Sequence, residues 1–208
     1  MLEARAICFG PKGTERPILD RVDLVLRPGE ITGLEGSSGV GKTTLGKILA
    51  GHVLPDQGQV TVMGEAYAGG FHPVQYLHQL PIFGVNPRWR IGRILTEAWA
   101  LDEETRAQLG IARNWDDRFP HEISGGQLAR VVLARALAPG LRFLVLDEIT
   151  AALDSITQAQ LWRFLTALAR ERGIGLLAIS HDRALLERVA SRRLRLQDGQ
   201  LEELVAAR

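Results

Sequence analysis

The chain has 208 residues, of which 46% are hydrophobic and 24% are charged, and its formal net charge is +1. This composition is ordinary for a globular protein, and the length suits one domain with room for an inserted subdomain. The nearly balanced charge argues against a general attraction to nucleic acid or to an anionic lipid surface, so we expect no nucleic acid as a partner.

We expect neither a signal peptide nor a membrane span. Residues Met1–Arg5 lack the apolar stretch of a signal peptide, and no apolar run approaches the ~20 residues of a transmembrane helix. Cys8 is the only cysteine and lies in an apolar run, which predicts a small buried residue in a protein of a reducing compartment. We therefore predict a cytoplasmic chain without direct membrane insertion, which reaches any membrane through a partner.

Two short strands are predicted early in the chain. Val22–Leu26 alternates apolar and polar residues, and Gln59–Met63 has the pattern of a second strand before Gly64. We expect these strands to form a small antiparallel layer beside the core of the protein.

Between them lies a segment that fits the phosphate-loop pattern G-x-x-x-x-G-K-S/T. It follows a strand-like run, Ile31–Glu35, and precedes a helix-like run, Leu45–Ala50. Glycines allow the loop to turn several backbone N–H groups toward one anion, and the helix N-terminus adds partial positive charge. The candidate nucleotide-binding residues are Gly36, Ser37, Ser38, Gly39, Gly41, Lys42, Thr43 and Thr44.

Two side chains of this loop have specific expected roles. Lys42 can reach the β- and γ-phosphates of ATP, and the Thr43 hydroxyl can ligate Mg²⁺. The alternative, a glycine-rich turn without a ligand, does not explain why the strand, the spacing and the helix occur together.

Three core strands are predicted further along: Val74–Leu77, Phe143–Leu146 and Leu176–Ile179. The last two are continuously apolar, as expected for strands covered on both faces. Between them Ser155–Glu171 is predicted to be one helix, with an apolar face made by Ile156, Leu161, Phe164, Leu165 and Leu168. This alternation predicts an α/β fold with a largely parallel sheet.

The middle of the chain is different. From about Arg88 to Arg118 there is no strand candidate, and Ile91–Trp99 and Glu103–Leu109 have helical patterns. We interpret this part as a helical insertion.

Two acids follow the apolar run Phe143–Leu146. A buried strand that ends in carboxylates places them at the carboxyl edge of a parallel sheet, where the phosphate loop also lies. There Asp147 can hold Mg²⁺ through water, and Glu148 can orient or deprotonate an attacking water molecule.

Ser124-Gly125-Gly126-Gln127 precedes a helical run, Leu128–Leu137. Ser124 can cap that helix, and the two glycines allow a close backbone approach to an anion. Because the phosphate loop already serves one nucleotide, this second anion cradle needs another phosphate. The alternative is a plain helix cap.

These motifs together resemble the ATP-binding-cassette (ABC) ATPases, and the resemblance covers nearly the whole chain. It implies a P-loop NTPase (RecA-like) core, an antiparallel β subdomain and a short helical subdomain at about residues 88–135. It also implies that Ser124–Gln127 binds the γ-phosphate of ATP held by a second ATPase subunit, in a homodimer or a heterodimer.

The same resemblance assigns four further residues. Gln79 matches the glutamine that senses Mg²⁺ at the loop leading to the helical subdomain, and Asp154 matches the aspartate that crosses the dimer interface. His181 matches the switch histidine that contacts the γ-phosphate. Phe9 matches the aromatic residue that stacks on adenine, although it could equally belong to the core of a strand.

Within the family the chain is most similar to the ATPases of peptide and nickel importers. Gln79-Leu80-Pro81, the segment Arg118–Gln127 and the segment Asp154–Gln160 carry this similarity. Two departures are Leu80, where the subfamily has an acid or amide, and Ile149, where a proline usually follows the catalytic glutamate. The stretch between Gln79 and Ser124 is also short for this subfamily.

Three functions are compatible with the sequence, and we expect the first. The first is a peripheral ATPase on the cytoplasmic face of the inner membrane, which drives uptake of nickel, a metal chelate or a short peptide through separate transmembrane subunits. The second is a soluble ABC ATPase of DNA repair or translation. The third is an accessory ATPase of a cytosolic enzyme complex, as in phosphonate breakdown.

Three of the four tryptophans lie in the helical region: Trp89, Trp99 and Trp115. Aromatic side chains anchor interfaces when they fill a partner's pocket. We expect at least one of them to be substantially exposed near Gln79, where a membrane subunit would dock. The alternative is that all three pack the core of the insertion.

Overall fold

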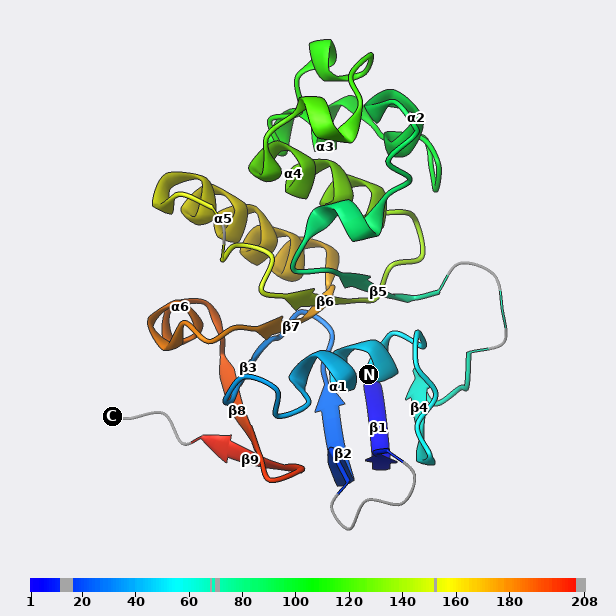
Figure 1. Ribbon diagram of the computed structural model, residues 1–208, viewed down its shortest axis with the longest axis vertical. Helices are drawn as coiled ribbons and strands as arrows, with labels where there is room; N and C mark the ends of the chain where they lie inside the picture. The colour runs from blue at the N-terminus through cyan, green and yellow to red at the C-terminus, as the bar shows by residue number, and fades with distance from the viewer. Residues whose placement is uncertain (12–16, 68, 70–71, 152, 205–208) are drawn as a thin grey trace.

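Helices and two sheets stack in layers in the computed structural model, which describes residues 1–11, 17–67, 69, 72–151 and 153–204 (Figure 1). The strands are β1 (Leu2–Phe9), β2 (Leu19–Leu26), β3 (Ile31–Glu35), β4 (Gln57–Val62), β5 (Val74–Leu77), β6 (Phe143–Asp147), β7 (Gly175–Ile179), β8 (Arg192–Gln197) and β9 (Gln200–Leu204). The α-helices are α1 (Lys42–Leu49), α2 (Ile91–Leu95), α3 (Glu103–Gln108), α4 (Gly125–Ala136), α5 (Ser155–Arg172) and α6 (Arg183–Val189).

The main sheet has the strand order β5-β6-β7-β3-β8-β9. All of its described pairs are parallel except β8 with β9. A second sheet, with the order β2-β1-β4, is antiparallel. The predicted α/β fold with an antiparallel layer is therefore confirmed, although β1, β8 and β9 were not among the predicted strands.

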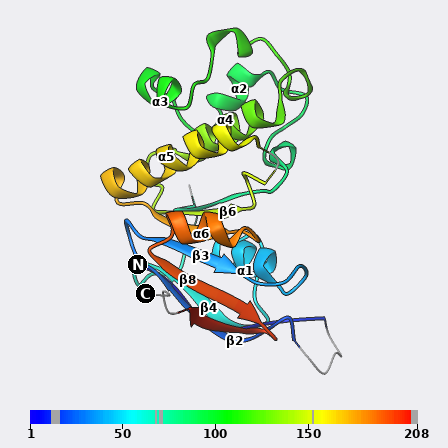
Figure 2. The same ribbon diagram turned by 90° about the vertical axis from the view of Figure 1, so that its left-hand side faces the viewer.

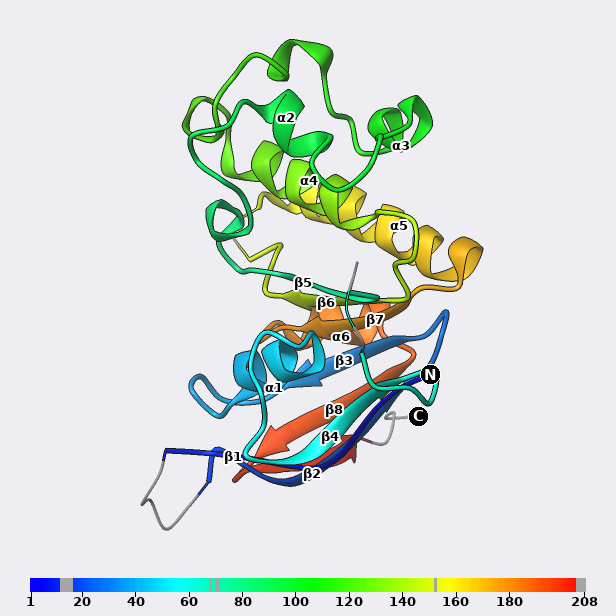
Figure 3. The ribbon, with the colours of Figure 1, turned by 90° about the vertical axis from the view of Figure 1, so that its right-hand side faces the viewer.

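Alternating residues of the central strands pack against two different layers. Phe143 and Val145 of β6 contact the cluster that contains α1 and the antiparallel sheet. Leu144 and Leu146 contact the cluster formed with α4 and α5. Figures 2 and 3 show the resulting order, with α1 between the two sheets and α4 and α5 on the far side of the main sheet. Continuous apolar sequence is thus explained by burial on both faces.

Between β5 and β6, the described residues form helices and no strand. Besides α2, α3 and α4 there are three short 3-10 turns: η1 (Pro81–Gly84), η2 (Arg113–Trp115) and η3 (Pro120–Glu122). This region projects to one end of the molecule (Figure 1). Its predicted first helix is shorter than expected, because it ends at Leu95 rather than Trp99.

Two predictions about buried residues are wrong. Ile156 was expected on the apolar face of α5, but it lies in the first turn and is 71% exposed, while the buried face begins at Leu161. Cys8 is only half-buried, because it lies near the end of β1, where its sulfur accepts a hydrogen bond from the Arg21 N–H.

Candidate nucleotide site

The phosphate loop joins the end of β3 to the start of α1. Gly36 and Gly41 have φ values of 154° and 111°, which lie in the region that glycine tolerates. A Cβ atom at Gly36 would lie 2.5 Å from the Leu196 carbonyl oxygen, and one at Gly41 would lie 2.7 Å from the Ile18 side chain. Both positions therefore require glycine for conformational and steric reasons.

Lys42 lies folded across this loop. Its Nζ donates hydrogen bonds to the carbonyl oxygens of Gly36 and Ser37, both at 2.9 Å. The first turn of α1 contains no acidic residue, so the positive end of the helix dipole is not neutralised there. The loop therefore presents positive charge and backbone N–H groups together, which suits a phosphate chain.

Asp147, at the end of β6, links the phosphate loop to the sheet. Its Oδ2 atom accepts a hydrogen bond from the Thr43 hydroxyl at 2.7 Å and another from the Tyr76 hydroxyl at 2.5 Å. Burial, together with the hydrogen bond to Asp147, raises the pKa of Tyr76 well above its usual range. The phenol therefore remains a proton donor at neutral pH.

Glu148 follows immediately and has a left-handed backbone conformation, with a φ value of 51°. Its Oε2 atom accepts a hydrogen bond from the Gln79 side-chain amide at 3.3 Å. The Nδ1 atom of His181 lies 3.1 Å from the same oxygen. These three residues follow β6, β5 and β7, so the parallel sheet brings them together at its carboxyl edge.

The segment Ser124–Gln127 lies elsewhere, at the start of α4. Ser124 Oγ accepts a hydrogen bond from the Gln127 N–H, and Gln127 Oε1 accepts one from the Ser124 N–H. A Cβ atom added at Gly125 would have no neighbour within 4 Å, so this turn is open. Among the described residues, no hydrogen bond or ion pair joins it to the phosphate loop, and Ser124 and Gly125 are exposed.

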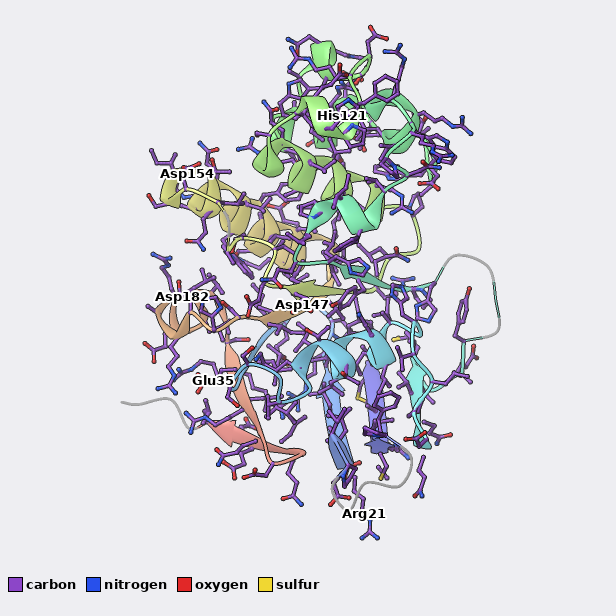
Figure 4. The ribbon with its side chains drawn as sticks, in the orientation of Figure 1. Arg21, Glu35, His121, Asp147, Asp154 and Asp182 are labelled. Carbon is purple, nitrogen blue, oxygen red and sulfur yellow. The ribbon has the colours of Figure 1, made fainter. Side chains whose placement is uncertain are left out.

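Asp154 caps the N-terminus of α5, at the outer end of that helix and far from Asp147 (Figure 4). It accepts hydrogen bonds from the backbone N–H groups of Thr157 and Ile156 and from the Thr157 hydroxyl. These hydrogen bonds lower the pKa of Asp154, and the bond from the Thr157 N–H is the largest cause. The exposed side chain is therefore held as a carboxylate. Ala152, two residues before Asp154, lies outside the described residues.

Phe9 ends β1 and is half-buried against the cluster that contains α1. Both interpretations of Phe9, adenine stacking and strand core, are compatible with this position, so its role stays a prediction.

The prediction about the tryptophans is wrong. Trp115 is 8% exposed, and Trp89 and Trp99 are partly buried against the core of the helical region. The Arg93 guanidinium covers the Trp89 ring at 3.8 Å, and the Trp99 indole donates to the Ala134 carbonyl oxygen. The large exposed apolar side chains that the structure describes in this region follow Gln79 instead. They are Leu80, Ile82 and Phe83, with exposed fractions of 53%, 36% and 70%.

Sequence reasoning missed Glu35, which ends β3 directly before the phosphate loop. It is 3% exposed, and its Oε1 atom accepts hydrogen bonds from Nη2 and Nε of Arg195 at 2.7 and 3.0 Å. Arg183 lies 3.6 Å from the same oxygen. The sequence offered one signal, a charged residue at the end of an apolar strand. It did not reveal the partner, because Arg195 is far from Glu35 along the chain.

It also missed a group of rings around Tyr76. His78 and His52 meet the Tyr76 ring edge-on, with centroids 4.8 and 5.6 Å away. Burial is the main cause that lowers the pKa of both histidines. These rings therefore pack as largely uncharged groups beside α1.

Comparison with known proteins gives a consistent result. The family model described as ABC transporter matches residues 19–151. The nickel import ATP-binding protein NikE of Rhodospirillum rubrum is 36% identical over 220 residues, which cover 96% of this chain and 79% of that protein. The "Probable D,D-dipeptide transport ATP-binding protein DdpF" of Escherichia coli is 36% identical over 198 residues. That match covers 89% of this chain, which spans only 63% of the relative's length.

The fold is also similar to solved structures. The ATP-binding cassette MJ0796, solved as a dimer in a post-hydrolysis state with ADP and Pi, has a TM-score of 0.83 and 22% identity, with both chains fully covered. A second dimeric structure of the same cassette has the same TM-score at 23% identity. Within the described part of this chain, no helix is long and apolar enough to cross a membrane.

The pair of Glu35 and Arg195 generates a stability prediction. Glu35→Ala should lower the free energy of unfolding by about 2 kcal/mol, because it removes the carboxylate that accepts two hydrogen bonds from the half-buried Arg195. The matched control Glu30→Ala, which breaks the surface pair with Arg27, should cost less than about 1 kcal/mol. Urea unfolding of the full chain measures both. Equal small losses would show that the Glu35 pair does not stabilise the strand end.

Proposed function

The chain belongs to the ABC transporter family of ATP-binding proteins, and we propose that it is the ATP-hydrolysing motor subunit of an importer. One observation carries the proposal: Gln79, Glu148 and His181 meet at the carboxyl edge of the sheet, next to Thr43 and Asp147. A nucleotide site with a carboxylate, an amide and an imidazole beside the phosphate loop is equipped for hydrolysis rather than for binding alone.

The residues of this site have different roles in binding and hydrolysis. The N–H groups of residues 36–44 and the Lys42 amine bind the phosphate chain, after Lys42 leaves its two carbonyl partners. Glu148 orients the attacking water and takes its proton. His181 and Gln79, which both contact Glu148 Oε2, set the position of that carboxylate relative to the γ-phosphate.

The donor set fits Mg²⁺. The Thr43 hydroxyl and the Asp147 carboxylate are hard oxygen donors in direct contact at 2.7 Å, and Mg²⁺ takes few protein ligands. Among the described residues there is no cluster of three or more His, Cys, Asp or Glu side chains that would bind a metal alone. Bound with ATP, Mg²⁺ supplies charge neutralisation on the phosphates, and Thr43, Asp147 and Gln79 are the residues that would hold it.

A second ATPase subunit completes the site. The open turn at Ser124–Gln127 is an anion cradle without a phosphate in its own chain, and Asp154 is exposed as a carboxylate at another helix start. In the proposed arrangement both face the nucleotide of the other subunit, and Ile156 lies in that contact. A related cassette was solved as a dimer, which supports this arrangement.

The membrane partner docks beside Gln79. Leu80, Ile82 and Phe83 are exposed there, and Phe83 borders a hollow of about 580 Å³ that Arg88, Glu97 and Arg135 also line. Exposed apolar residues beside a hollow with charged walls suit a docking helix of a transmembrane subunit. The helical region at about residues 88–135 would pass its motion to that subunit from the cytoplasmic face of the inner membrane.

The cargo class rests on the relatives alone. The named relatives serve nickel import and D,D-dipeptide transport, so nickel, a metal chelate or a short peptide is the proposed cargo. This similarity favours the importer over a soluble repair or translation ATPase and over an accessory ATPase of an enzyme complex.

Glu148→Gln should abolish steady-state hydrolysis and leave ATP binding within about twofold of wild type. The amide is nearly isosteric with the carboxylate but cannot accept the proton of water. Phosphate release and equilibrium binding of a fluorescent ATP analogue measure the two effects. Hydrolysis near the wild-type rate would remove Glu148 from the catalytic role.

Lys42→Ala and Ser124→Arg should fail in different ways. Lys42→Ala should weaken ATP binding to the isolated subunit at least tenfold, because it removes a charge from the phosphates. Ser124→Arg should leave that binding intact and prevent ATP-dependent association of two subunits. Light scattering with and without ATP tests the association, and equal loss of monomer binding in both variants would contradict this division.

Phe83→Ala should reduce transport and transporter-stimulated hydrolysis several-fold while basal ATP binding is unchanged, because Phe83 is the most exposed of the three apolar residues after Gln79. Leu54→Ala is the matched control, since Leu54 is 83% exposed and lies between α1 and β4. If both variants behave like wild type in the assembled transporter, the membrane subunit docks elsewhere.

A further inference from the structure

The hydroxyl of Tyr76 makes a contact that the assigned roles do not use. It donates to Asp147 Oδ2 at 2.5 Å, the oxygen that also accepts from Thr43. Among the described residues, neither hydroxyl donates to Oδ1. The two donors thus occupy one side of the carboxylate and leave the other oxygen for a further partner.

The Tyr76 ring has little freedom to move. It belongs to β5, pairs in register with Val145 of β6, and is 8% exposed. His78 and His52 pack edge-on against it, and a Cβ atom at Gly46 would lie 3.2 Å from the ring. Because the ring is enclosed by a strand, a helix and two histidines, the fold determines the position of its hydroxyl oxygen.

Asp147 needs such a donor. The terminal torsion of an aspartate is broad, so a carboxylate at a strand end rotates unless hydrogen bonds hold it. The Thr43 hydroxyl is one donor that restrains the Asp147 carboxylate, but its oxygen is also a proposed metal ligand. Tyr76 approaches from the sheet side and has no competing role, and a hydrogen bond to an ionised carboxylate is stronger than one between neutral groups.

We propose that Tyr76 is a positioning residue for Asp147, which it holds in the orientation needed to bind the metal that accompanies ATP. This inference rests on the proposed metal site at Thr43 and Asp147. Tyr76 touches neither nucleotide nor metal and acts through the carboxylate alone.

Tyr76→Phe tests the inference because it removes only the hydroxyl and keeps the ring. The Mg²⁺ concentration that half-saturates hydrolysis at fixed ATP should rise roughly tenfold, the effect of losing one hydrogen bond to a charged group. Mn²⁺ affinity for the protein–ADP complex, measured by electron paramagnetic resonance, should fall by a similar factor. Binding of a fluorescent ATP analogue in EDTA should change less than twofold.

Tyr67→Phe is the matched control, since Tyr67 is the only other tyrosine and is 45% exposed. Its metal dependence should equal that of wild type. If Tyr76→Phe lowers the maximal rate, or weakens nucleotide binding in EDTA, without changing metal affinity, the residue serves packing only and the inference is wrong. If hydrolysis by the wild-type protein needs no divalent metal, the proposed metal site at Thr43 and Asp147 is wrong, and the inference about Tyr76 falls with it.

A measurement on the natural sequence covers the case in which Tyr76→Phe does not fold. Protein labelled with 3-fluorotyrosine contains two fluorine-bearing residues, and Tyr67→Phe assigns their signals. Adding Mg²⁺ to the ADP complex should shift the Tyr76 signal and leave the Tyr67 signal unchanged. If the Tyr76 signal does not shift when Mg²⁺ is added, the inference is wrong.

Discussion

The close approach of α1 to the main sheet is the constraint on which the nucleotide site depends. At Gly46 a Cβ atom would lie 3.0 Å from Val145 and 3.1 Å from Ile179, so the helix rests almost directly on β6 and β7. This proximity brings Thr43, in the first turn of the helix, within 2.7 Å of Asp147 at the end of β6. A larger residue at Gly46 would lift the helix and separate the two groups that are proposed to share the metal.

The parallel sheet supplies the rest of the site. Because β5, β6 and β7 run in the same direction, the residues that follow them, Gln79, Glu148 and His181, emerge at one edge although they are far apart in sequence. The contacts among them are long or depend on an exposed histidine, whereas Asp147 is held by two short hydrogen bonds. The phosphate- and metal-facing half of the site is therefore organised in advance, and the water-activating half has room to adjust when nucleotide and partner arrive.

The sequence predicted those parts of the protein that local patterns encode. The phosphate loop, the apolar run before Asp147 and the cap at Ser124 each involve neighbours in sequence, and the fold places them as expected. Strand β8 was missed because it is rich in arginine, and the carboxylates that pair with those arginines, Glu35, Glu187 and Glu203, lie on other elements. Tyr76 was missed for the same reason, since its partner Asp147 belongs to the neighbouring strand.

The errors about exposed residues also have physical causes. Trp89 looked like an interface anchor, but the Arg93 guanidinium lies over its ring, one turn further along the chain. Ile156 fitted the helical pattern of α5, yet it lies in the first turn, at the outer end of the helix where Figure 4 shows Asp154. The side chain is exposed there. Periodicity identifies a helix face, but it does not say where the neighbouring layer ends.

A crystal structure with Mg²⁺ and a non-hydrolysable ATP analogue would test most directly that two subunits build one ATP site. The account predicts that the analogue lies against residues 36–44 of one chain, with its terminal phosphate within hydrogen-bond distance of Ser124 and Gly126 from a second ATPase subunit. A nucleotide fully enclosed by a single chain, with residues 124–127 in solvent in every subunit, would contradict it.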